Sequence, residues 1–347
     1  MGGSSPSAIG GGRLPAWAPY AVAVGSAVVV GAVLVMTKFT IVLMVLGTAL
    51  VSSLAIYTLS RSVESARQAK DRLMSVSIAS AFVLAILPLG ALLSTVISKG
   101  LARFDSTFFT ESARNVVGEG GGAIHAIWGT LIITALATVI SVPIGVMAAI
   151  YLHEYGKGRL RRALTFFVDV MTGIPSIVAG LFAFALFAIF LGPGIRLGVI
   201  GSVALSVLMI PIVIRSTEEM LKIVPNHLRE ASYALGTPKW KTITKIVLPT
   251  ALAGIITGVM LAVARIIGET APLLVTAGVI DSTNVDPFSG RMQNLAVYAF
   301  NEYRSPGIPP EASYDRAWAA ALTLILIVMV LNVIARIVYR RFGTEIR

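Results

Sequence analysis

Uncharged apolar runs alternate with short polar segments along the whole chain. A run of about 18 or more apolar residues is long enough to cross a bilayer as a helix. The pattern predicts eight spans, over residues 17–36, 39–60, 74–98, 123–152, 164–191, 197–214, 246–277 and 317–335. Only Thr37 and Lys38 separate the first two spans, so we expect a tight helical hairpin there. The chain is therefore predicted to be an all-α membrane protein that crosses the bilayer several times.

Helix-breaking residues lie inside some of these spans. Pro88 predicts a kink in the third span. The fifth span contains Gly173 and Pro175, and near its inner end it carries Asp169, which we interpret as an interfacial or capping carboxylate. After the seventh span we expect a long outer segment that contains an amphipathic piece at 292–303.

The composition agrees with a membrane protein. Of the residues, 56% are hydrophobic and only 13% are charged, whereas soluble domains carry about 25% charged residues. A net charge of +11 is compatible with nucleic-acid binding. The basic residues, however, cluster beside the ends of apolar runs, at 61–72 and 153–162, as the positive-inside rule describes for cytoplasmic segments. We therefore expect no nucleic-acid partner and two cytoplasmic termini, with residues 1–15 as a flexible tail.

A polar segment, Ser216–Pro249, separates the sixth and seventh spans. Residues 227–235 are compatible with a short helix that ends at Gly236, because glycine readily adopts the left-handed conformation of a helix C-terminus. Thr237 is then predicted to cap a second short helix, with Pro238 in its first turn. Two short amphipathic helices at a membrane surface suggest docking to a soluble partner, and an ordinary solvated loop is the alternative.

The residue spacing in this segment resembles the signature loop of ABC importer permeases, E-A-A-x3-G-x9-I-x-L-P. The matching positions are Glu230, Ala231, Gly236, Ile246, Leu248 and Pro249. Ser232 replaces the second alanine, which exchanges one small residue for another. The resemblance implies that residues 216–249 form coupling helices that seat in a cytoplasmic ATPase. The residues implied in this contact are Glu230, Ala231, Ser232, Leu235, Gly236 and Pro249.

A wider resemblance covers residues 74–341, which are similar to the permease subunit of phosphate-specific ABC importers, the PstA type. The segments that carry it are AAIYLHE (148–154), PSIVAGLF (175–182), PIVIRSTEEML (211–221), REASYALGTPKWK (229–241) and ARIIGETAPLL (264–274). The resemblance implies a type I ABC importer transmembrane fold with a six-span permease core at 73–347. Residues 16–72, a hairpin with a basic cytoplasmic linker, depart from the family and are interpreted as an addition.

The same resemblance implies the permease subunit of an ATP-driven phosphate importer in the cytoplasmic membrane. Its implied partners are a second, similar permease subunit, two cytoplasmic ATPase subunits and an extracytoplasmic phosphate-binding protein. Sulfate and molybdate permeases share an Arg-x-x-Gly-Glu element and remain an alternative, although the continuation GETAPLL at Gly268–Leu274 favours phosphate. A secondary ion-coupled transporter is a further alternative, and the signature loop counts against it.

The sequence contains no pattern expected of an enzyme. It has no G-x-x-x-x-G-K-[ST] motif, so the chain is not predicted to bind ATP phosphates by itself. It has no cysteine, and its three histidines lack metal-ligand spacing. We therefore expect no catalytic residue, no metal and no cofactor, and the absence of a nucleophile with a neighbouring base argues against a membrane-embedded enzyme.

Charged residues within the spans are candidates for a substrate path. Arg265 and Glu269 lie four residues apart, which places them on one face of the predicted seventh helix. An arginine at the middle of a bilayer costs about 3 kcal/mol on insertion scales, so such residues usually face a cavity or a partner. A mutually neutralising pair that packs the helices is the alternative. Arg215, at the inner end of the sixth span, either assists the ion or anchors the polar segment. The predicted path comprises Arg265, Glu269, Arg215 and Thr270, and the family resemblance strengthens the functional interpretation of both arginines.

Overall fold

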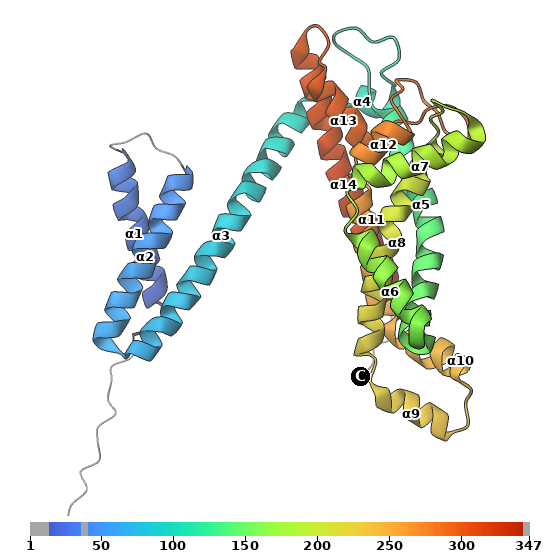
Figure 1. Ribbon diagram of the computed structural model, residues 1–347. Helices are drawn as coiled ribbons and strands as arrows, with labels where there is room; N and C mark the ends of the chain where they lie inside the picture. The colour runs from blue at the N-terminus through green and yellow to red at the C-terminus, as the bar shows by residue number, and fades with distance from the viewer. Residues whose placement is uncertain (1–13, 36–40, 343–347) are drawn as a thin grey trace, which may run out of the picture. The chain divides into compact units, whose positions relative to one another are not determined.

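The computed structural model describes residues 14–35 and 41–342, and every regular element in these ranges is a helix (Figure 1). In chain order these are α1 (Ala18–Val35), α2 (Ile41–Val63), α3 (Ala66–Gly100), η1 (Leu101–Arg103), α4 (Ser106–Thr110), α5 (Ile124–Ile150), η2 (Tyr151–Tyr155), α6 (Gly158–Thr172), α7 (Ser176–Leu191), α8 (Gly198–Ile223), α9 (Asn226–Ala234), α10 (Lys239–Thr242), η3 (Ile243–Val247), α11 (Leu248–Ile266), α12 (Ala271–Thr276), α13 (Leu295–Arg304) and α14 (Pro310–Phe342). The predicted turn at Thr37 and Lys38, and most of the tail predicted for residues 1–15, lie outside the described residues.

The prediction of a multi-pass helical membrane protein is confirmed. Within the described ranges, seven helices are long and apolar enough to cross a membrane, and the bent pair α6–α7 brings the number to eight if it counts as one span. The chain divides into two compact units, Met1–Thr95 and Val96–Arg347, and the boundary falls inside α3.

The first unit is a helical hairpin followed by most of α3. A Cβ atom on Gly47 of α2 would lie 2.8 Å from Val30 of α1, so glycine is needed for the close packing of this hairpin. Glu64 lies between α2 and α3 and accepts hydrogen bonds from Arg72 Nε at 2.8 Å and Nη2 at 2.7 Å. The backbone N–H of Leu14 donates to the same carboxylate at 2.8 Å. These bonds join the residues before α1 to the corner between α2 and α3.

The predicted basic linker at 61–72 is not a loop. α2 continues to Val63 and α3 begins at Ala66, so only Glu64 and Ser65 separate the two helices. Residues 66–72 consist mainly of alanine, arginine, glutamine and lysine, which are strong helix formers despite their charge. The basic character of the segment therefore marks the ends of two helices.

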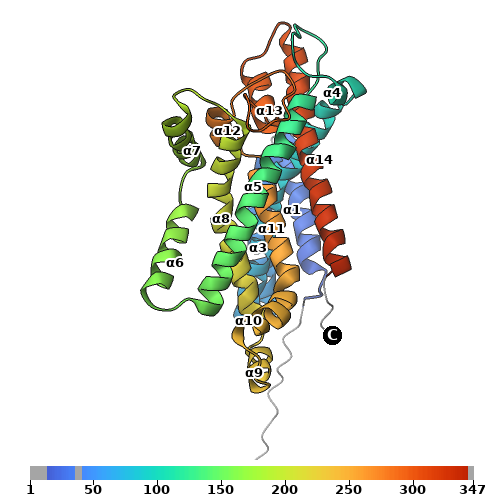
Figure 2. The ribbon, with the colours of Figure 1, turned by 90° about the vertical axis from the view of Figure 1, so that its right-hand side faces the viewer.

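The core of the second unit lies between α5, α8 and α11 (Figure 2). Its interior contains Ile133 from α5, Met209 from α8 and Ile266 from α11, each almost completely buried. Gly145 allows α5 to approach α8, because a Cβ atom there would lie 2.7 Å from a methyl group of Val213. Figures 1 and 2 show α9 and α10 at one end of this unit, and α4 and α13 at the opposite end. The piece predicted at 292–303 is helical from Leu295 onward as α13, but its first turn is buried on all sides, so the expected two-faced pattern is limited to the rest of the helix.

Two predicted spans are wrong as continuous helices. In place of the fifth, α6 and α7 meet at an angle of 109°. Pro175 accounts for this break, because it lacks an N–H donor and restricts the preceding residue to extended conformations. In place of the seventh, α11 ends at Ile266 and α12 begins at Ala271. Gly268 is a poor helix former, and Pro272 lies in the first turn of α12, where proline is well tolerated.

The sixth span is longer than predicted. α8 continues through residues 215–221 and ends at Ile223, because the segment STEEML has no helix breaker and follows directly on the apolar run. The first part of the predicted loop 216–249 is therefore helical and belongs to α8.

Candidate functional site

The coupling segment, which we define as Val224–Thr242, forms the end of the second unit. Its first helix is α9, and Leu228 packs against the buried cluster formed by Leu221, Val247 and their neighbours. Leu235 is the C-cap residue, and Gly236 follows with φ of +73°. The predicted short helix and its left-handed glycine terminus are confirmed.

The second helix of the segment differs from the prediction. Pro238, and not Thr237, is the N-cap residue of α10, and no side chain caps it. α10 continues through the π-helical turn η3 into α11, so Lys239–Ile266 is one continuous helix. Pro249 accounts for the π-helical turn η3, because proline has no N–H to donate to the carbonyl oxygen of residue 245. The wider turn before Pro249 changes the hydrogen-bonding register of the helix.

Ser232 joins the two helices of the coupling segment. Its hydroxyl lies 2.8 Å from that of Thr242, and both residues are buried. Alanine, the usual residue at this position of the signature, could not form this bond. The substitution therefore does more than conserve size.

The outer surface of the coupling segment is available to a partner. Glu230, Ala231 and Gly236 are exposed, and the apolar side chain of Leu235 is 85% exposed. Beside them lies a cavity of about 460 Å³, lined by Leu228, Ala231, Ser232, Leu235, Thr237, Lys241, Lys245 and Ile246. Exposed apolar side chains around a concave surface are typical of a protein interaction site.

Arg265 and Glu269 share a second, smaller cavity of about 210 Å³. It is lined by Met171, Thr172, Ile174, Ser176, Leu208, Pro211, Ile212, Arg265, Ile266 and Glu269. The prediction that the two charges share one helical face is wrong, because Arg265 is in the last turn of α11 and Glu269 is beyond its end. They lie at one cavity because the chain turns at residues 267–270. Thr270 does not line it and is the N-cap residue of α12.

One positive and one negative side chain line this cavity. Arg265 is exposed and Glu269 is partly exposed, and none of the ion pairs among the described residues joins them. Ser176 is the first residue of α7, so the positive end of that helix also lies at the cavity. Gly173 and Pro175 indicate the break in the sequence, but no local pattern shows that it brings a helix N-terminus to the cavity of Arg265.

Arg215 lies elsewhere and is already paired. Its guanidinium donates hydrogen bonds to Asp169 of α6 and, at 2.9 Å, to Glu218 one turn further along α8. Asp169 therefore has a partner that the sequence did not indicate, since it was assigned to an interface or a helix cap. Arg215 is not among the residues that line the cavity of Arg265.

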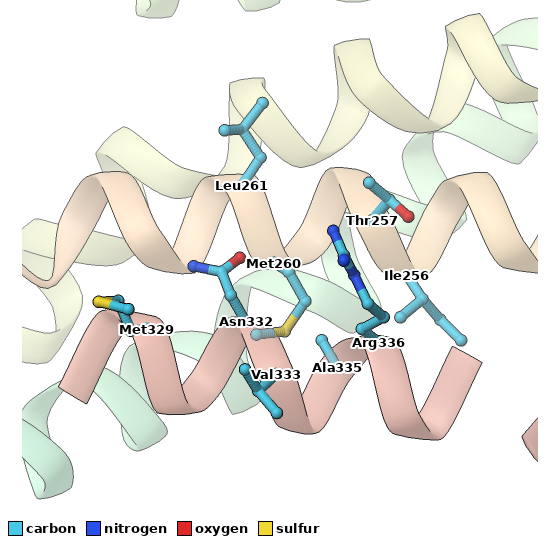
Figure 3. A pocket seen from close by; sticks show the side chains of 9 residues that line it. All are labelled: Ile256, Thr257, Met260, Leu261, Met329, Asn332, Val333, Ala335 and Arg336. Atoms are coloured by element: carbon cyan, nitrogen blue, oxygen red, sulfur yellow. The ribbon is translucent and has the colours of Figure 1, made fainter. Parts of the chain in front are cut away.

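A larger groove of about 710 Å³ lies between α11 and α14 (Figure 3). Its walls are mostly apolar, and Figure 3 shows Asn332 and Arg336 extending from α14 toward α11. None of the predicted path or coupling residues lines it. Size therefore does not identify the candidate site, because the predicted path residues Arg265 and Glu269 line the smaller cavity.

A bundle of apolar helices with a charged cavity and an exposed helical coupling segment defines a membrane transport permease. Residues 141–347 match the model of the family described as binding-protein-dependent transport system inner membrane component, and the chain belongs to this family.

Relatives extend this similarity to most of the chain. "Phosphate transport system permease protein PstA 1" of Mycobacterium tuberculosis (strain H37Rv) is 46% identical over 275 residues, which cover 78% of this chain and 88% of that protein. "Phosphate transport system permease protein PstA" of Yersinia pestis is 39% identical over 276 residues, which cover 79% of this chain and 92% of that protein.

Solved structures support the fold. A bacterial ABC transporter involved in the import of the polysaccharide alginate aligns with a TM-score of 0.57 at 14% identity, over 79% of this chain and 97% of that chain. The MetNI methionine ABC transporter aligns with a TM-score of 0.52 at 20% identity, over 64% and 96%. The type I ABC importer transmembrane fold is thereby confirmed.

Proposed function

We propose that this chain is the transmembrane permease subunit of an ATP-driven importer of inorganic phosphate. The observation that carries the proposal is the cavity where Arg265, Glu269 and the first turn of α7 meet. It gains support from the 46% identity to a protein named as a phosphate permease. Phosphate enters from the outside and passes this cavity on its way to the cytoplasm.

The permease works with other subunits. We assign it a second, similar permease chain, two cytoplasmic ATPase subunits and an extracytoplasmic phosphate-binding protein, in the inner membrane with both termini in the cytoplasm. The exposed coupling segment supplies the surface for the ATPase. ATP binding and hydrolysis move this segment, and the helices alternate between outward-open and inward-open arrangements.

The chemistry of the cavity fits a partly protonated anion. Phosphate near neutral pH carries a charge of about −1.5 and keeps at least one proton. Arg265 offers a planar donor group that stays charged and matches phosphate oxygens. Glu269 weakens the electrostatic attraction, so the ion is released, and its carboxylate accepts a hydrogen bond from protonated phosphate. Sulfate has no such proton, so it would place two negative groups face to face, which favours phosphate over sulfate.

The function is tested by transport in vesicles that contain all the subunits. We expect ATP-dependent accumulation of radiolabelled phosphate that requires the binding protein and is not inhibited by excess sulfate or molybdate. Accumulation of sulfate or molybdate in place of phosphate would assign the chain to another oxyanion. Phosphate uptake that persists without the ATPase subunits would make it a secondary transporter.

A further inference from the structure

Both helices of the coupling segment contact one residue, Glu154, at the end of α5. From α9, the Arg229 guanidinium donates to Glu154 Oε1 from Nη2 at 2.8 Å and from Nε at 3.2 Å. From α10, Lys239 donates through Nζ to the backbone carbonyl oxygen of Glu154, and its ammonium lies 4.8 Å from the ring centre of Tyr155. Glu154 itself lies in the π-helical turn η2. Such turns frequently mark functional positions.

Arg229 also binds the end of α8. Its Nη1 donates to the carbonyl oxygen of Val224 at 2.7 Å, and its Nη2 donates to that of Leu221 at 3.1 Å. These carbonyl groups belong to the last turn and C-cap of α8, where they have no partner within the helix. A positive charge there also interacts favourably with the helix dipole. One guanidinium therefore joins α8 and α9 to the turn η2, which continues α5.

The burial of this pair separates it from an ordinary surface ion pair. The side chain of Glu154 is 6% exposed and that of Arg229 is 11% exposed. Exposed pairs contribute little, but removing one partner of a buried pair leaves an uncompensated charge. A buried ion pair adds little net stability, because apolar residues of similar volume often stabilise a protein equally well. Their fixed geometry suits a role in positioning.

The helix α8, whose end Arg229 binds, lines the cavity of Arg265. α8 contributes Leu208, Pro211 and Ile212 to the cavity of Arg265, and α5 packs along α8 through Ile133 and Gly145. A displacement of α9 that is passed to the end of α8 therefore acts on the wall of that cavity.

We propose that Arg229 and Glu154 are positioning residues that make the coupling segment, α5 and α8 move together, and so transmit the motion of the ATPase to the Arg265 cavity. This inference rests on the proposed function. It adds Arg229 and Glu154 to the coupling machinery, to which the signature assigned only residues that follow Arg229. Neither residue touches the transported ion.

The test measures phosphate uptake and ATP hydrolysis in the same vesicles of the full complex. The variants are Arg229→Gln, Glu154→Gln and the double variant. We expect assembly and hydrolysis to persist, and phosphate moved per ATP to fall by about tenfold, within the range of typical coupling between sites. Because the two residues act as a pair, the double variant should be no worse than either single variant. Glu64→Gln is the control, since it removes the buried carboxylate of an ion pair in the first unit and should leave this ratio unchanged.

A second readout does not depend on the transported ion. In this cysteine-free chain, Leu208→Cys places a single thiol at the cavity, and its labelling rate reports the motion of the cavity wall. We expect ATP with vanadate to change this rate in the otherwise wild-type complex and to leave it unchanged with Glu154→Gln. Wild-type coupling and labelling in both single variants would overturn the inference. If the wild-type complex moves no phosphate, the proposed function fails, and the labelling experiment still decides the role of the pair.

Discussion

At the residue scale, Gly236 shows how a single backbone conformation supports the coupling segment. Its φ is +73°, and a Cβ atom built there meets no heavy atom within 4 Å. Space is therefore available, and only the backbone conformation excludes a branched side chain. We expect Gly236→Val to insert into the membrane normally but to lose uptake, because the end of α9 is displaced. Gly236→Asn, which tolerates this conformation better, is the control. Normal transport by Gly236→Val in the full complex would contradict the coupling assignment.

Ser232 makes a smaller contribution to the coupling segment than Gly236 does, and the two contributions can be measured separately. Its hydrogen bond to Thr242 is buried, and losing such a bond costs about 1 kcal/mol. We expect Ser232→Ala to lower the thermal stability of the purified protein slightly and to retain most uptake. Thr242→Val should have a similar effect, and the double variant should be no less stable than either single one. Additive losses would show that the two hydroxyl groups act independently.

The hydrogen bonds of Glu64 should make the stability of the first unit depend on pH. Hydrogen bonds from Arg72, Ser60 and the backbone of Leu14 lower the pKa of its carboxyl group from 4.5 to about 2. The folded state therefore favours the ionised form, and the resulting stabilisation is full above pH 4.5 and is lost as the pH falls toward 2. We expect Glu64→Gln to melt at a lower temperature than wild type at pH 6, with the difference shrinking toward pH 2. A constant difference over this range would contradict the role of the ionised carboxylate.

At the element scale, the apolar pattern predicted most helices but not their interruptions. The spans at 17–36, 39–60 and 123–152 correspond closely to α1, α2 and α5. Hydropathy shows only that a segment is apolar. The predicted fifth span therefore runs across α6 and α7, and the predicted seventh span runs across α11 and α12. The local signals were present in Pro175 and in Gly268 with Pro272, but proline also occurs inside continuous helices here, as Pro88 and Pro143 do.

For the candidate site too, the sequence indicated individual residues but not the partners that surround them. Arg265 and Glu269 were found as charges within an apolar run, and the signature spacing located Gly236. The partners that define their surroundings are distant in sequence, so no local pattern indicated them. Arg215 binds Asp169 across 46 residues, and Arg229 binds Glu154 across 75. Such pairs depend on how α5, α6 and α8 pack.

At the scale of the whole molecule, the orientation in the membrane is open to a direct test. The basic segment around Gly158 is proposed to be cytoplasmic, as is the coupling segment. Gly158→Cys introduces a single thiol, since the natural chain has no cysteine. We expect a membrane-impermeant thiol reagent to label this variant only in inverted vesicles. Labelling from outside intact cells would show that this segment faces outward and would contradict the proposed orientation.

Substitution of Arg265 tests directly whether phosphate passes the cavity that this residue lines in the second unit. The measurement is ATP-dependent phosphate uptake by vesicles of the full complex that carry Arg265→Gln. Arg336→Gln is the matched control, because Arg336 lines the separate groove between α11 and α14. We predict that Arg265→Gln abolishes uptake while assembly and ATP binding persist, and that Arg336→Gln transports normally. Wild-type uptake by Arg265→Gln would contradict the passage of phosphate through this cavity.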